Sequence, residues 1–181
     1  MEANEAKGYI RKLEPGEIDD GPSWYLPHFP VVREDKETTK VRIVYDSAAR
    51  YGGVSLNDTM LAGPKLQQDI FDVLLPFRSN PVALVADLME MFSQVVMAKK
   101  DRRYHCFLWR GLDLSKPPEV YEAVRLVFGD RASPYLAQYV VRQHAEDNRD
   151  NYPLVVNIIL LQMYMDDIMT SLETDDEAIE A

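Results

Sequence analysis

An apolar run that stops at two adjacent carboxylates constrains the fold of this chain more than any other stretch. The run covers residues 158–165, is interrupted by Asp166 and Asp167, and resumes at residues 168–169. A strand, a tight turn and a second strand accommodate this pattern, because the strands bury apolar side chains while the turn lifts the aspartates out of the core. Hairpin turns favour Asn-Gly or Asp-Gly, and no glycine occurs here. An isolated Asp-Asp pair is most simply a polar hairpin tip, so a functional interpretation needs a second observation.

That second observation is Asp87, which follows the continuous apolar segment 82–86. Such a segment is typical of a strand buried on both faces. Carboxylates at the ends of two strands converge if the strands are neighbours in one sheet. Their oxygen atoms suit Mg²⁺, and two such ions, about 3.5–4 Å apart, can clamp the attacking and leaving oxygens of a phosphoryl transfer. Bound cations would also relieve the repulsion between the two adjacent aspartates.

Length and composition set outer limits on these interpretations. With 181 residues and 46% hydrophobic residues, the chain is predicted to be one globular domain or two small lobes. The sequence has neither an apolar segment of membrane-spanning length nor the pattern of a signal peptide, so we expect an intracellular protein and no membrane partner. The single Cys106 agrees with a reducing compartment. The histidines, His28, His105 and His144, have no zinc-ligand spacing.

The formal net charge of −10 counts against a nucleic-acid partner, because phosphate binding normally leaves a basic footprint. Part of this charge is local, however. Acidic residues gather in segments 14–20 and 173–177, whereas segments 36–50 and 99–103 carry basic residues. The overall charge therefore disfavours such a partner without excluding one.

Local patterns predict the remaining elements. Prolines favour an extended segment at 24–33, and a strand follows at 40–46 with Lys40, Arg42 and Val44 on one face. A face carrying Lys40 and Arg42 is most simply solvated surface. Further strands are expected at 82–86, 107–109 and 120–128. Pro64 is expected to open a helix that Pro76 ends, with Leu66, Ile70, Phe71, Leu74 and Leu75 at helical spacing. Ser133 and Pro134 are expected to begin another helix, whose buried stripe is Leu136, Ala137, Val140, Val141, His144 and Ala145.

Several of these segments resemble motifs of reverse transcriptases. Residues 164–167 (Tyr-Met-Asp-Asp) are similar to the family's catalytic hairpin, 86–92 to its first acidic motif, and 128–134 to the glycine and Ser-Pro motif between them. The upstream segments that look like the Bel/Pao class of long-terminal-repeat retroelements are 25–33, 40–46, 55–58, 63–64 and 107–110. The motifs occur in family order and cover nearly the whole chain from Trp24 onward.

This resemblance implies an α+β fold comprising the fingers and palm of a right-hand polymerase. The palm would be an antiparallel sheet with helices on one face, and the chain would end before the thumb. The implied division is a polar lead-in at 1–22, fingers at 23–80, palm at 81–96, fingers at 97–132, and palm with the catalytic hairpin at 133–181. We therefore expect the thumb, ribonuclease H and integrase to belong to the remainder of a retroelement polyprotein.

The resemblance also implies a set of site residues. The catalytic residues and metal ligands would be Asp87, Asp166 and Asp167, holding two Mg²⁺ ions, with Mn²⁺ as an alternative ion. The residues implied to bind the deoxynucleoside triphosphate are Arg42, Lys36, Leu88, Phe92 and Gly129. Arg42 would contact the triphosphate, Phe92 would exclude a 2′-hydroxyl, and Gly129 would let the backbone approach the nucleotide. Many reverse transcriptases carry Gln where this chain has Phe128, so no hydrogen-bonding role is assigned there.

The expected function is RNA-directed DNA polymerisation by two-metal nucleotidyl transfer from a deoxynucleoside triphosphate to a primer 3′-hydroxyl. The expected partners are an RNA or DNA template with its primer. The alternative is a catalytically silent retroelement remnant that only binds nucleic acid or protein. Intact acidic residues favour the polymerase, whereas the net charge of −10 favours the remnant.

Overall fold

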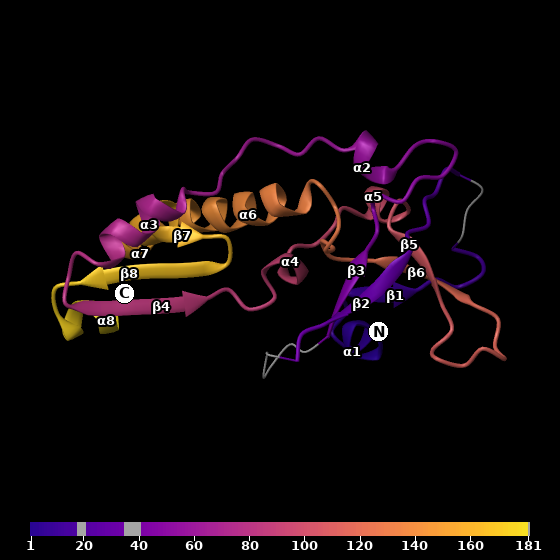
Figure 1. Ribbon diagram of the computed structural model, residues 1–181, viewed down its shortest axis with the longest axis horizontal. Helices are drawn as coiled ribbons and strands as arrows, with labels where there is room; N and C mark the ends of the chain where they lie inside the picture. Colours follow the sequence, from indigo (N-terminus) through magenta and orange to yellow (C-terminus); the bar gives the residue numbers. More distant parts are fainter. Residues whose placement is uncertain (18–20, 35–40, 181) are drawn as a thin grey trace. The chain divides into compact units, whose positions relative to one another are not determined.

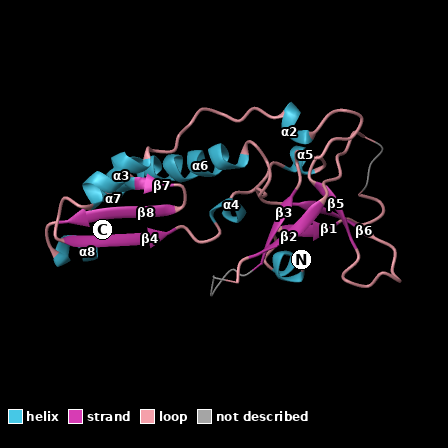
Figure 2. Cartoon of the chain, viewed as in Figure 1, coloured by secondary structure: helices cyan, strands magenta, loops and turns pink. Residues whose placement is uncertain are grey.

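The chain passes back and forth between two structural units, shown in a computed structural model that describes residues 1–17, 21–34 and 41–180. Unit 1 comprises Met1–Ala62 and Phe92–Ser133, and unit 2 comprises Gly63–Met91 and Pro134–Ala181. Both units contain helices and strands (Figures 1 and 2). The mixed α+β class predicted from the sequence is thus observed, and each unit has its own antiparallel sheet.

Unit 1 is built from two small β-structures and short helices. Its strands are β1 (Ile10–Lys12), β2 (His28–Val32), β3 (Val41–Tyr45), β5 (Cys106–Trp109) and β6 (Glu119–Ala123). Its helices are α1 (Glu2–Ala6), α2 (Leu56–Thr59) and α5 (Lys99–Arg102), and α4 (Met91–Gln94) begins at the unit boundary. The order β1-β6-β5 forms one sheet, and β2 and β3 form a hairpin. Because β1 pairs with β6, the expected polar lead-in contains a strand of this sheet.

Aromatic rings form the centre of unit 1. The Phe107 side chain is fully buried and lies between the Tyr45 ring, at 5.2 Å, and the Tyr121 ring, at 5.6 Å, measured between centroids. Aliphatic side chains, among them Ile10 and Leu26, pack in the same cluster. This core joins β1, β3, β5 and β6, so it holds together strands that are far apart in the sequence.

Unit 2 is a three-stranded sheet with helices packed on its central strand. Its elements are α3 (Ile70–Phe77), β4 (Val82–Asp87), α6 (Ser133–Asp147), α7 (Pro153–Gln162), β7 (Met163–Tyr164), β8 (Asp167–Leu172) and α8 (Asp175–Glu180). The strand order is β4-β8-β7. Helices α3 and α7 contact β8 and lie along one side of the strands (Figure 1). The Ser171 side chain links β8 to α3, donating to the Pro76 carbonyl at 2.7 Å.

The predicted strand at residues 158–165 is largely wrong. Residues up to Gln162 belong to helix α7, and only Met163 and Tyr164 are extended. A short apolar run does not distinguish a buried strand from a helix, and Pro153 at the start of α7 favours a helix because its missing N–H costs nothing there. Strand β6 is likewise shorter than the predicted 120–128 and ends at Ala123.

The helix expected to begin at Pro64 begins instead at Ile70. The Asp69 side chain accepts a hydrogen bond from the Phe71 amide at 3.0 Å and thereby caps the helix. Pro76 lies in the last turn, one residue before the helix ends. Val73 is fully buried, whereas Phe71 and Leu75 are 73% and 69% exposed. The apolar spacing therefore identified a helix, but not its buried face.

Two other predictions of which side chains are buried were wrong in part. In α6 the buried alanines are Ala137 and Ala145, as expected, but Leu136, Val140 and His144 form the adjacent i, i+4 line and are exposed. The second error concerns β4, which was expected to be covered on both faces. In β4 the side chain of Val85 is 62% exposed, so only one face of this strand is packed in the described chain.

We expect Val73→Ala to lower the free energy of unfolding by about 1–3 kcal/mol, because the substitution removes two buried methyl groups and leaves a cavity. Urea denaturation measures the change. The control is Leu75→Ala on the same helix, whose exposed side chain predicts a much smaller loss. Equal losses would contradict the burial of Val73 in α3.

Candidate functional site

The pairing of β4 with β8 places two of the predicted acids opposite each other. Asp87 is the register partner of Asp167, and the Leu88 amide donates to the Asp166 carbonyl at 2.8 Å. Asp87 and Asp167 therefore occupy a non-hydrogen-bonded position, where opposed Cα atoms are about 4.5 Å apart and side chains approach most closely. Like charges at such a position repel each other. The acids, 80 residues apart in sequence, thus meet at one end of the sheet.

The turn that carries Asp166 has an unusual backbone. Tyr164 pairs with Asp167, which leaves Met165 and Asp166 as a two-residue loop. Met165 has φ of 57°, and the φ signs match a type II′ turn, in which glycine normally takes the first position. Three residues after the end of β4, Glu90 has φ of 55°. Both left-handed non-glycine residues of the described chain thus lie within three residues of a predicted catalytic acid, and strained backbone of this kind gathers at functional sites.

The acidic end of the sheet matches the ligand preference of a hard divalent cation. Asp87 and Asp167 are exposed and Asp166 is half-buried, so their carboxylates are accessible. Oxygen donors of this kind suit Mg²⁺ or Mn²⁺. In the ranges that the structure describes, however, no three His, Cys, Asp or Glu side chains are gathered so as to hold a metal ion. The observed arrangement is two opposed carboxylates with a third acid in the adjoining turn.

Three other predicted residues gather around Phe128 in unit 1. The Arg42 guanidinium carbon lies 5.6 Å from the Phe128 ring centroid, a cation–π distance. The Phe92 ring lies 4.9 Å from the Phe128 ring, between centroids. Gly129 is the next residue along the chain. Phe128, which was assigned no hydrogen-bonding role, is therefore the residue that joins the others.

Gly129 has a structural reason to be glycine. Its φ is 122°, and a Cβ atom there would lie 1.7 Å from the Tyr45 carbonyl oxygen. Asn57 holds the same loop from another direction, because its side chain donates to the Gly129 carbonyl at 3.0 Å and accepts from the Arg131 amide at 2.8 Å. The close backbone approach seen here is to β3, and an approach to a nucleotide remains a prediction.

Sequence reasoning missed a buried polar network that anchors this loop. Asp130 accepts hydrogen bonds from the Ser47 hydroxyl and from His105 Nε2, the latter at 2.7 Å, and all three side chains are buried. Burial lowers the pKa of His105, but the hydrogen bond and negative charge of Asp130 outweigh it, and the net pKa is raised. Only the fold brings these residues together, and no spacing in the sequence indicates it.

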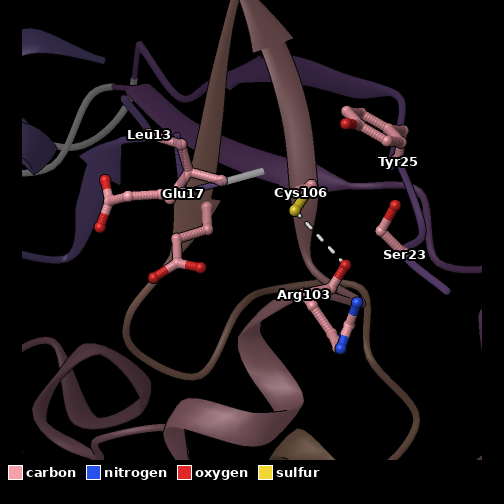
Figure 3. Close-up of a pocket in the computed structure, with 7 residues that line it drawn as sticks. Leu13, Glu17, Ser23, Tyr25, Arg103 and Cys106 are labelled. Carbon is pink, nitrogen blue, oxygen red and sulfur yellow. Dashed lines mark hydrogen bonds between the residues drawn. The ribbon is translucent and has the colours of Figure 1, made fainter. Parts of the chain in front are cut away.

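Unit 1 contains a small pocket whose lining includes none of the predicted site residues (Figure 3). It encloses about 60 Å³, which holds only a few water molecules. Cys106 in its wall donates to the Arg103 carbonyl, at an Sγ–O distance of 3.4 Å, and burial raises the pKa of its thiol to about 11. A protonated thiol is a poor nucleophile, so this pocket does not offer cysteine chemistry.

The structure thus distributes the predicted site over both units. Unit 2 contains Asp87, Leu88, Asp166 and Asp167, and unit 1 contains Arg42, Phe92 and Gly129. Lys36 lies outside the described residues. The contact of Arg42 with the triphosphate stays a prediction.

Comparison with known proteins decides the family. Residues 53–181 match the model of the family described as "Reverse transcriptase (RNA-dependent DNA polymerase)". The chain belongs to the reverse transcriptase family. This range includes all three predicted acids, and membership implies use of a divalent metal. A search of curated proteins gave no match.

Solved structures of reverse transcriptases share the fold. A foamy viral protease–reverse transcriptase in complex with double-stranded DNA matches with a TM-score of 0.68 and 22% identity, over 98% of this chain and 25% of that one. The native prototype foamy virus protease–reverse transcriptase matches with a TM-score of 0.66 and 20% identity, over 99% of this chain and 20% of that one. The chain therefore spans a quarter or less of these relatives and has the mixed α+β fold of a fingers and palm region. No helix in the described ranges is long and apolar enough to cross a membrane.

We expect stability to fall as the pH rises from about 6.5, the ordinary histidine pKa, through the raised pKa of His105. Protonated His105 favours the folded state, so its contribution is fully present below this window and lost above it. Urea denaturation across the window measures the slope. His105→Gln should remove it, while His144→Gln, at an exposed histidine, should retain it. His28 titrates below the window, because burial lowers its pKa. An unchanged slope in His105→Gln would contradict the assignment.

We also expect Asp87→Asn to stabilise the metal-free protein by a few tenths of a kcal/mol, because it removes a like charge opposite Asp167. Thermal unfolding at low ionic strength measures the gain, which should shrink in high salt. Asp150→Asn, at an exposed aspartate of the same unit, should give no such gain. Adding Mg²⁺ should stabilise the unaltered chain more than Asp87→Asn. Identical responses to Mg²⁺ would remove Asp87 from the metal site.

Proposed function

We propose that this chain is the fingers and palm part of an RNA-directed DNA polymerase from a Bel/Pao-type long-terminal-repeat retroelement. The observation that carries the proposal is the register pair of Asp87 and Asp167, with Asp166 in the adjoining turn, in a chain of the reverse transcriptase family. Unit 1 would be the fingers and unit 2 the palm. The assignment to the Bel/Pao class rests on the upstream segments, such as 25–33 and 40–46.

The acids Asp87, Asp166 and Asp167 would hold two divalent ions, Mg²⁺ or Mn²⁺. When bound, the ions would stabilise the charge on the attacking and leaving oxygens of an in-line displacement. They would also offset the repulsion at the Asp87–Asp167 position, which explains why a sheet would keep two carboxylates opposite each other. The protein's own contribution is the antiparallel pairing of β4 and β8, which sets Asp87 opposite Asp167.

The nucleotide would be bound mainly by residues of unit 1. Arg42 is exposed on β3, and its guanidinium can hold phosphate oxygens bidentately while keeping its charge. Phe92 would pack beneath the sugar and exclude a 2′-hydroxyl. Leu88 and Gly129 would contribute backbone to the site, and Lys36 would add a second positive charge.

A template with its primer would be the macromolecular partner, in line with the double-stranded DNA in the foamy viral complex. The thumb, ribonuclease H and integrase would belong to the rest of the polyprotein. A catalytically silent remnant is the second candidate, favoured by the net charge of −10. Nucleic-acid affinity requires many neutralised phosphates, so this chain alone should bind primer–template weakly at physiological salt.

Primer extension on an RNA template tests the proposal. We expect the chain to add few nucleotides by itself and more when it is extended to include the expected thumb. Asp166→Asn should abolish addition by either form, whereas Asp150→Asn, at an exposed residue of the same unit, should have no effect. Lack of extension by a folded longer chain would favour the silent remnant.

A further inference from the structure

Phe128 contacts two residues that the proposed function places at the nucleotide. Its ring lies 5.6 Å from the Arg42 guanidinium carbon and 4.9 Å from the Phe92 ring centroid. We propose that Phe128 is a positioning residue, which orients Arg42 toward the triphosphate and Phe92 toward the sugar. This inference rests on the proposed function and assigns a role to a residue that does not itself need to touch the nucleotide.

The backbone of Phe128 is fixed to the strand that carries Arg42. The Tyr45 amide donates to the Phe128 carbonyl at 2.8 Å, and Val44 forms a parallel bridge with Phe128. The glycine at position 129 permits this approach, since any Cβ there would collide with the Tyr45 carbonyl. The ring therefore has a defined place beside β3, two to three residues from Arg42.

Residues 129–131, which follow Phe128, are also held by hydrogen bonds. Asn57 bonds the Gly129 carbonyl and the Arg131 amide, and Asp130 is buried between Ser47 and His105. These contacts come from α2, from the loop after β3 and from the residue before β5. Because the loop is held by these contacts, the Phe128 ring can restrain an exposed side chain packed against it.

The Arg42 side chain must be ordered before it can bind a phosphate. It is long and exposed, and much rotamer freedom must be lost before it can hold a phosphate. A cation–π contact uses the charge of the guanidinium and leaves its N–H donors available for phosphate oxygens. Phe128 can therefore limit where Arg42 points without competing for the ligand.

The same ring limits Phe92. The Phe92 and Phe128 rings are tilted by 33°, within the range of favourable aromatic pairs. Replacing Phe128 with a smaller side chain would open space behind Phe92 and let its ring withdraw from the sugar. One substitution at position 128 should therefore disturb both triphosphate binding and sugar selectivity, a combination that a purely structural residue would not produce.

The decisive variant is Phe128→Leu, tested in primer extension by the chain extended to include the expected thumb. We expect the KM for deoxynucleotide to rise about two- to fivefold, the range of an exposed cation–π contact, with a smaller change in kcat. The kcat/KM for ribonucleotide relative to deoxynucleotide should rise as well. Phe128→Tyr keeps the aromatic face and should restore both values.

Two comparisons separate positioning from stability. Tyr121→Leu removes another aromatic ring of unit 1, which stacks on Phe107, and should lower stability without changing the KM or the selectivity. In Arg42→Ala the further change Phe128→Leu should add little to the KM, because the two residues act through one contact. Independent, additive effects on KM, or a loss of stability alone in Phe128→Leu, would overturn the inference.

A second readout keeps the inference separate from the proposed polymerase. The Phe128 ring should shift the NMR signals of the Arg42 side chain in the unaltered chain and in Phe128→Tyr, and the shift should vanish in Phe128→Leu. If the chain never extends a primer but the shifts behave in this way, the contact stands and the proposed function fails. If extension occurs and Phe128→Leu leaves KM and selectivity unchanged, Phe128 has no positioning role.

Discussion

The antiparallel pairing of β4 with β8 is the constraint on which unit 2 depends. Strand β8 is central: it pairs with β4 and β7, and α3 and α7 pack against it. Its register opposes Asp87 and Asp167, and a shift of one residue would turn one of these carboxylates to the other face of the sheet. The same hydrogen bonds that form the sheet therefore set the spacing of the acids. Val73 on α3 and Ser171 on β8 are both buried, and the bond from the Ser171 hydroxyl to the Pro76 carbonyl ties β8 to α3.

In unit 1 the main constraint is on the loop at residues 128–131. Residues 128–131 belong to no helix or strand, so their backbone groups need partners from elsewhere. Tyr45 and Asn57 supply those partners, and Asp130 is buried with both of its oxygens bonded. A buried polar network with satisfied hydrogen bonds rigidifies its surroundings, because leaving any member unpaired would be unfavourable in a low dielectric. These hydrogen bonds consequently hold the loop that carries the Phe128 ring in one conformation.

Much of this architecture follows from the sequence, and the exceptions have physical causes. The carboxylates after apolar segments predicted neighbouring strands at Asp87 and Asp167, and the pairing of β4 with β8 confirms it. The apolar run before Met163 was assigned to the wrong element, because all-apolar segments lack a period that separates helix from strand. The Ser47–Asp130–His105 network was not predictable, since it depends on tertiary contacts between residues up to 83 positions apart. The contact between Arg42 and Phe128 is hidden in the sequence for the same reason.

The acids lie next to backbone that a stability optimum would avoid. Met165 and Glu90 are left-handed without being glycine, a conformation that costs about 1–3 kcal/mol each. Glycine at position 165 would relieve the turn at once, because the first position of a II′ turn favours it. Glycine would also loosen the loop that carries Asp166, since it has more conformational freedom to lose. A strained but restricted turn beside two opposed carboxylates would hold charge in a defined place, which the proposed cation site needs and a plain hairpin tip does not.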